Sequence, residues 1–262
     1  MKTFIKVTIV SLFISLAACK KDEKSPESVI TPEPTVTTGS LKIELGHMVD
    51  TLPLEFGKNY INPKGDTFMV SKFNYFISNI VLTAADNSTY SEPASYHLIK
   101  HNNAGNFITI ANVPPVSYKS ISFMLGVDSA ANVSGAQGGD LAQSKSGDMY
   151  WGWSSGYIAF KLEGSSPKSG DVQKTLTYHI GGYSGPYKSQ RVYNIVFPGE
   201  TADVTTTVTP VLHLGVNVNK FFRGIDVSAP GFYNHMSATS ANNKVFADNY
   251  ADMISFEHLH NH

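Results

Sequence analysis

The side chains in this sequence that are best suited to holding a metal ion are its nine histidines. His47 stands between Leu45 and Val49 in a segment where apolar and polar residues alternate, so we expect it to point inward. A buried histidine is usually a core residue with satisfied hydrogen bonds. A metal ion is the other reason to place an imidazole among aliphatic side chains, because burial favours the neutral form that metals bind. Both interpretations of His47 are open on the sequence alone.

Two further histidines lie in settings that suit ligation. His179 precedes the double glycine of Tyr178-His-Ile-Gly-Gly182 and shares a strand face with threonines, so it faces either solvent or a site. His235 and Met236 place an imidazole beside a thioether, and both groups suit copper(I). Because adjacent residues on an extended chain point apart, we expect one ligand from this pair.

The remaining histidines have weaker signals. His213 is expected at the surface, and His97 and His101 are expected to be strand and turn residues without a motif. The tail Glu257-His-Leu-His-Asn-His262 would place three imidazoles on one face if it were extended, which can chelate a metal ion. Exposed ends of chains are usually disordered, which argues against such a role.

An aromatic segment holds both tryptophans of the chain. Trp151 and Trp153 lie two residues apart, flanked by Tyr150 and Tyr157, so an extended backbone would direct both indoles to the same face. Such rings often form part of a core, since Trp and Tyr bury large areas. They are also suited to stacking on sugars and to redox chemistry.

Familiar catalytic motifs are missing from the sequence. The single cysteine excludes a thiol pair and a C-x-x-C-H haem site, and there is no G-x-S-x-G, H-E-x-x-H or Walker motif. Asp128, Asp140 and Asp148 fit turns better than a calcium loop. We therefore expect no enzyme. A net charge of −1 makes nucleic acid an unsuitable partner.

The elements that must position these residues are mostly strands. Short alternating segments separated by Gly- and Pro-containing turns predict a mainly β protein, an antiparallel β-sandwich in a single domain with long loops and little helix. Phe73, Phe76, Ile77, Ile80 and Val81 follow helical spacing behind Ser71, so a helical turn is expected before a strand there. The tail from Ala229 onward is expected to be irregular, with one short helix over 242–252.

The first nineteen residues have the form of a lipoprotein export signal. Lys2 and Lys6 precede an apolar run over 7–16, which is shorter than the roughly 20 residues that span a bilayer. Leu16-Ala-Ala-Cys19 resembles the lipobox of bacterial lipoproteins. The predicted organisation is a signal peptide over 1–18, a lipidated disordered tether over 19–39 and a folded domain over 40–262. Lipid on Cys19 would hold the protein to the outer membrane, on its periplasmic or its cell-surface face.

Several motifs together resemble the methanobactin-associated MbnP-like family. The resemblance rests on Phe123–Asp128, on Met149–Ile158 with its W-x-W-x-x-G-Y pattern, and on Tyr178–Gly182, with weaker support from Leu45–Val49, Asn74–Ile80 and Tyr96–Ile99. It covers roughly residues 40–255. It implies a β-rich exported protein that binds copper, in which a partner di-haem enzyme of the cytochrome c peroxidase type oxidises a tryptophan to kynurenine.

The resulting hypothesis is a copper-binding lipoprotein without turnover chemistry, active in copper uptake or homeostasis. His47 and His179 are its expected principal ligands, His235 the third, and Trp153 rather than Trp151 the oxidised ring. The alternative is a glycan- or protein-binding β-sandwich lipoprotein without a metal, in which the aromatic segment is a stacking platform. Convergence of His47, His179 and the two indoles in one pocket would favour copper, whereas their separation would favour the binding protein without a metal.

Overall fold

The computed structural model describes residues 37–102, 105–135, 137–152, 156–229, 233–236 and 238–262, with only the backbone described over 233–236. These residues form one compact unit, Thr37–His262. The predicted signal peptide, Cys19, most of the predicted tether and Trp153 lie outside the described residues. Within the described part of the chain, none of the helices has the length and apolar character needed to cross a membrane.

A five-stranded sheet, called sheet A here, is built around β1 (Gly39–Val49). Its order is β16 (Ile254–His260), β14 (Val211–Asn217), β1 and β2 (Leu52–Pro53), and β7 (Phe107–Val113) also pairs with β1. Strands β1 and β14 run parallel, whereas the other pairs are antiparallel. The predicted alternation of β1 is confirmed, because every second residue from Leu41 to Val49, His47 included, is buried.

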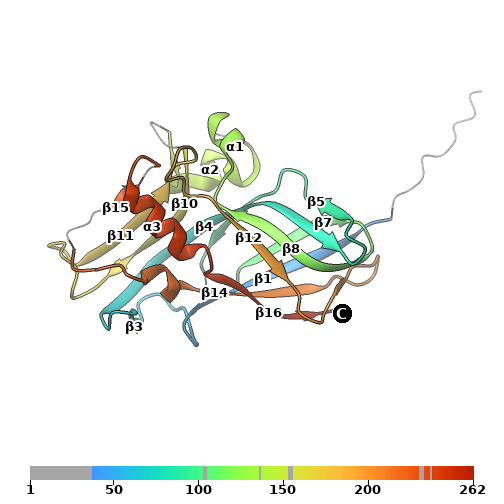
Figure 1. The fold of residues 1–262 in the computed structure, drawn as a ribbon, viewed down its shortest axis with the longest axis horizontal. Helices are drawn as coiled ribbons and strands as arrows, with labels where there is room; N and C mark the ends of the chain where they lie inside the picture. The colour runs from blue at the N-terminus through green and yellow to red at the C-terminus, as the bar shows by residue number, and fades with distance from the viewer. Residues whose placement is uncertain (1–36, 103–104, 136, 153–155, 230–232, 237) are drawn as a thin grey trace, which may run out of the picture. The chain divides into compact units, whose positions relative to one another are not determined.

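A larger eleven-stranded sheet, called sheet B, packs against the inner face of sheet A through a shared apolar core (Figure 1). Its main order is β12 (Arg191–Val196), β8 (Ser117–Leu125), β4 (Thr67–Ala84), β10 (Gly156–Ser165), β11 (Thr175–Gly181) and β15 (Tyr233–Met236). The short strands β3 (Asn59–Ile61), β5 (Thr89–Ser91), β6 (Tyr96–Lys100), β9 (Tyr150–Trp151) and β13 (Ala202–Asp203) attach to its long ones. The predicted mainly β, sandwich-like fold is confirmed.

The helical turn expected around residues 73–81 is wrong, since β4 is one long strand there. Phe73, Tyr75 and Ile77 face the main core, while Phe76 belongs to a second apolar cluster on the other face of sheet B. A strand buried on both faces has no alternating pattern, which explains the helix-like spacing. Near its far end the strand has a register shift, and Asn79 adopts a positive φ of 54°.

Short helical segments cover the outer face of sheet B. They are α1 (Ser129–Val133), α2 (Gln143–Ser146) and the 3-10 helices η1 (Gly139–Leu141) and η2 (Gly147–Met149). The three aspartates of this region have structural partners, as the turn interpretation predicts. Asp128 caps α1, Asp140 accepts a hydrogen bond from the amide of Leu98, and Asp148 pairs with Lys72 and Lys161.

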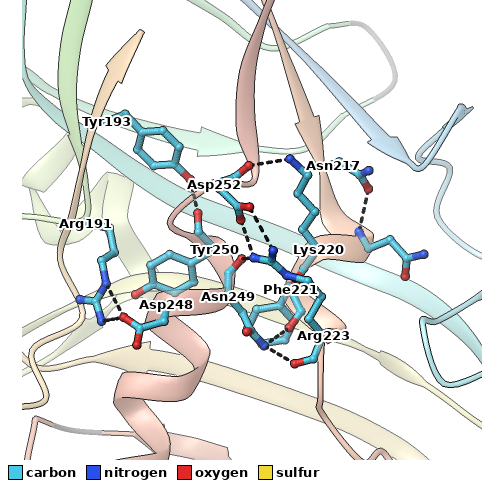
Figure 2. A network of polar contacts seen from close by, with 11 residues as sticks. Arg191, Tyr193, Asn217, Lys220, Phe221, Arg223, Asp248, Asn249, Tyr250 and Asp252 are labelled. Carbon is cyan, nitrogen blue, oxygen red and sulfur yellow. Dashed lines mark hydrogen bonds and ion pairs between the residues drawn. The ribbon is translucent and has the colours of Figure 1, made fainter.

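The C-terminal part of the chain returns to sheet A through helix α3 (Ala241–Tyr250), which corresponds to the helix expected over 242–252. A polar network fixes α3 against β12 and the 3-10 helix η3 (Val218–Phe222) (Figure 2). Its ion pairs join Arg191 to Asp248 and Arg223 to Asp252. The chain then forms β16, so the irregular tail expected after the helix is wrong. Backbone pairing with β14 orders this segment.

Candidate metal centre

Two imidazoles meet at one edge of the sandwich core. Nδ1 of His47, on β1, lies 2.8 Å from Nδ1 of His101, which follows β6. The two ring centroids are 4.9 Å apart and tilted by 52°. At this separation the two nitrogens share one proton, with one ring donating and the other accepting. Two neutral nitrogen donors therefore already face each other.

Neighbouring side chains fix the orientation of His47. Its Nε2 lies 2.8 Å from the hydroxyl of Tyr75, which is buried in the core, and Phe73 packs edge-on against the ring. The amide nitrogen of Asn106 lies 3.3 Å from Nδ1. A histidine whose second nitrogen is already bonded to a hydroxyl is held in one orientation, as is usual for metal-ligating histidines.

Burial keeps this pair uncharged. Desolvation, assisted by the nearby His101, lowers the pKa of His47 from 6.5 to about 3. Burial also lowers the pKa of His101, and the backbone of Leu54 opposes part of that shift. Both rings are consequently neutral at pH 7, the protonation state in which imidazole binds metals.

Two polar atoms of this group have no hydrogen-bond partner among the described residues. They are Nε2 of His101 and Oδ1 of Asn106, and both are buried. Buried polar groups are normally satisfied, so each such atom calls for a ligand, a water or an ion. A surface cleft of about 320 Å³ leads to the pair and is lined in part by His47, His101 and Asn106. The imidazoles are thus buried yet reachable from solvent.

His101 is the residue that sequence reasoning missed. It was expected to be a turn residue without a motif, but its amide donates to the carbonyl of Phe73, which extends the β6–β4 ladder. In that register His101 has the same phase as Ile99, which is buried in the core. Extending the strand alternation by two residues from Ile99 predicts that the side chain of His101 also points inward.

His179 does not join this pair. It lies on β11 opposite Lys161 of β10, which in turn lies opposite Asn74 of β4. These positions alternate with Phe73, Tyr75 and Tyr178, which face the core. His179 is therefore on the outer face of sheet B, where its Nε2 lies 2.7 Å from a carboxylate oxygen of Glu163. The expected convergence of His47 and His179 is not found, because strand alternation directs His47 into the core between the sheets and His179 to the outer face of sheet B.

Trp151 lies on the same outer face as His179. It belongs to the second apolar cluster with Phe76, Tyr157 and Ile158 and is 9% exposed. Its ring covers Gly181, where an added Cβ would lie 2.5 Å from the indole, so only glycine fits there. Because the ring is buried, Trp151 offers no open stacking face for a sugar, whereas Trp153 lies outside the described residues.

His235 lies on β15, which pairs in parallel with β11, in a register that places Tyr233 beside Tyr178 and Met236 beside Ile180. The backbone of this strand therefore brings the predicted third ligand to the strand of His179 rather than to that of His47. The sequence-predicted residues divide into two groups, with His47 in the core and His179, His235 and Trp151 associated with β11 and its outer covering.

Comparisons with known proteins agree with this architecture. The model of the MbnP family matches residues 38–240. Among solved structures, MbnP from Methylosinus trichosporium matches with a TM-score of 0.53 at 15% sequence identity, covering 77% of this chain and 84% of that chain. At this identity the structural match supports a shared fold. A search of curated proteins finds no match.

Proposed function

The chain belongs to the MbnP family, and from that premise we propose that it is an exported lipoprotein that binds copper, as Cu(I), between His47 and His101. The observation that carries the proposal is the 2.8 Å approach of the two Nδ1 atoms at the inner end of a solvent-accessible cleft. This pair replaces the ligand set of His47, His179 and His235 expected from the sequence.

The donor set suits a soft monovalent cation. Two neutral imidazoles satisfy Cu(I), which accepts few ligands and favours imidazole and sulfur over hard oxygen donors. A carboxylate would favour a harder, divalent ion, and no carboxylate is hydrogen-bonded to either ring among the described residues. When bound, copper would be held by Nδ1 of His47 and Nδ1 of His101, and the proton between the two rings would move to Nε2 of His101. The rings would have to move apart, because two metal–nitrogen bonds of about 2 Å each do not fit within the present 2.8 Å separation.

Tyr75 and Asn106 act on the ligands rather than as ligands. The Tyr75 hydroxyl bonds Nε2 of His47 and so leaves Nδ1 directed toward His101. Outer contacts of this kind fix the tautomer and orientation of a ligating histidine. The protein's own contribution is thus a pair of neutral, oriented donors at the edge of the core.

The wider setting of the proposal follows from the N-terminal segment and the family. Lipid on Cys19 would anchor the domain to the outer membrane through the tether, on the periplasmic or cell-surface face. Copper uptake or homeostasis, without turnover chemistry, is the corresponding role. The proposal also includes conversion of Trp153 or Trp151 to kynurenine by a di-haem peroxidase-like partner.

A glycan- or protein-binding role without a metal is the second candidate. Its stacking platform would have to use Trp153, since Trp151 is buried under the helical covering. The paired imidazoles would then be structural. Copper binding by the chain distinguishes these two functions directly.

The decisive experiment is a Cu(I) titration of the whole chain without a histidine tag, in competition with a chromophoric Cu(I) chelator. His101→Gln should weaken Cu(I) binding at least about 100-fold, beyond the loss of an outer contact. His97→Gln is the matched control, because His97 is bonded to Glu92 in the turn before β6 and should leave the affinity unchanged. Equal affinity in the wild type and His101→Gln would overturn the proposal.

The modification and the anchor need a separate measurement. Intact-mass analysis of protein from its native host should show a lipidated N-terminal cysteine, and peptide mapping should place kynurenine at residue 151 or 153. An unmodified mass would remove the partner oxidase from the proposal and leave the His47–His101 pair to be judged by the titration.

A further inference from the structure

A second group of imidazoles lies on the opposite face of sheet A. His213 of β14 and His258 and His260 of β16 each offer a ring nitrogen, and these nitrogens all lie within 4.8 Å of one another. The rings of His213 and His258 are stacked with centroids 4.2 Å apart, and His260 is edge-on to both, at 5.0 and 4.8 Å. These three residues are called the surface triad below.

Strand register brings the surface triad together. His213 lies directly opposite His258, and His260 lies opposite Val211, one pair further along the same face. A register shift follows the first pair, where Glu257 is the extra residue in β16. Such a bulge redirects the adjacent side chains and strengthens the local twist. Regular cross-strand pairing thus supplies two ligands and the diagonal neighbour supplies the third.

The surroundings of the surface triad are polar and open on one side. Glu44 of β1 lies opposite His213 in the parallel ladder, and its carboxylate is 3.3 Å from Nδ1 of His213. The side chain of His213 is 19% exposed, whereas His258 and His260 are exposed. Lys42 lies on β1, two residues before Glu44. Its ammonium group is directed toward β7, with Nζ 3.8 Å from the centre of the Phe107 ring. The triad is therefore flanked by a carboxylate and accessible to a solvated ion.

We propose that His213, His258 and His260 form a second metal site, which takes a divalent transition-metal ion and binds Cu(II) most tightly. The surface triad offers three imidazoles and a nearby carboxylate, whereas the buried pair offers two imidazoles. The donor set of the triad is therefore larger and harder. Imidazole sites favour Cu(II) among the divalent first-row ions. Glu44 orients His213 through its ring nitrogen, as outer carboxylates commonly do for ligating histidines. Exposure leaves coordination positions for water, so the bound ion can exchange.

The site would also connect two strands. Because its ligands come from β14 and β16, a bound ion would fasten the C-terminal strand to sheet A. An ion that binds only the folded chain raises its thermal stability by mass action. This gives a readout that does not depend on the buried pair or on the function proposed for it.

The test uses the whole chain, without a histidine tag, carrying His101→Gln to remove the buried pair. Equilibrium dialysis against micromolar Cu(II) should show one equivalent bound, and adding His258→Gln and His260→Gln should abolish it. Adding His97→Gln instead, a change at a partly buried histidine on sheet B, should leave it intact. Nitrogen couplings in the EPR spectrum and a rise in the melting temperature on Cu(II) addition should disappear with the triad.

Two results would overturn the second site. One is equal Cu(II) uptake with and without His258 and His260. The other is no Cu(II) uptake by the chain with an intact triad, provided that circular dichroism shows a folded protein. Because His101→Gln is present throughout, the outcome is independent of whether His47 and His101 bind Cu(I).

Discussion

Two histidine groups on opposite faces of sheet A show how burial changes what the same side chain can do. His47 lies on the inner face of β1, against sheet B, and shares a proton with His101. Glu44, three residues earlier on the same strand, lies on the outer face and contacts His213 of the surface triad. One face of sheet A thus contributes His47 to a largely buried pair with His101 of sheet B, and the other face carries the exposed triad.

The comparison of the inner pair with the surface triad shows that the number of ligands in a site and the burial of those ligands are determined independently. The inner pair has few donors, but packing and hydrogen bonds have already buried His47 and fixed its orientation. The surface triad has more donors and an adjacent carboxylate, but its rings must be ordered when an ion binds. The first arrangement suits a soft ion held tightly, and the second suits a divalent ion that exchanges.

The largest expected effect is on stability at the inner pair. Replacing His47 by alanine would leave a cavity beside Phe73 and remove the partner of the buried Tyr75 hydroxyl. We expect a loss of about 3 kcal/mol in the free energy of unfolding of the metal-free protein, measured by urea denaturation. His258→Ala is the matched control on the other face. Similar losses in the two variants would contradict the contrast in burial.

The pH dependence of the free energy of unfolding is the second expected difference between the inner pair and the surface triad. Because burial, and to a lesser degree His101, lowers the pKa of His47 to about 3, the unfolded chain takes up a proton below pH 6.5 that the folded chain does not. The free energy of unfolding of the metal-free protein should therefore fall between pH 6.5 and about 3, by about 1.4 kcal/mol per pH unit for this one group. The difference between the wild type and His47→Gln isolates it. A difference that does not vary with pH would contradict the assigned burial.

The sequence could identify His47 but not its partner. The alternation around Leu45 and Val49 is a local signal, and it correctly gave an inward imidazole. The contact with His101 joins residues 54 positions apart and depends on how β6 pairs with β4 and how sheet B packs on β1. No local periodicity carries that information. The expected pairing with His179 failed because alternation gives the two faces of a strand without saying which face meets the other sheet.

The C-terminal histidines show the same limit. An extended tail was recognised as placing its imidazoles on one face, and β16 is extended. The partner strand β14 ends at Asn217, before α3, and the chain reaches β16 only after passing through α3, which Figure 2 shows held by its polar network. The sandwich class follows from many short alternating strands, whereas the residues that share a site follow from non-local register.

A smaller effect is expected from the contact that orients His47. Tyr75→Phe keeps the ring in the core but removes the hydroxyl bonded to Nε2. We expect about 1 kcal/mol of destabilisation and about a 10-fold weaker affinity for Cu(I), since outer contacts tune a ligand without supplying it. Urea denaturation and the chelator titration measure the two effects. Tyr90→Phe is a matched control, because that hydroxyl bonds a backbone carbonyl near the surface. An unchanged Cu(I) affinity in Tyr75→Phe would show that His47 needs no such orientation.

The smallest effect is expected at the surface triad without metal. His258 is exposed and bonded to no buried group among the described residues, so His258→Gln should change the free energy of unfolding by less than about 0.5 kcal/mol. With Cu(II) present the same substitution should lower the melting temperature relative to the wild type, because only the intact triad gains from binding. Paired thermal melts with and without Cu(II) measure both values. If His258→Gln is destabilised equally with and without Cu(II), the stacked rings serve the pairing of β14 with β16 rather than metal binding. The proposed difference between the structural inner pair and the metal-dependent surface triad would then be wrong.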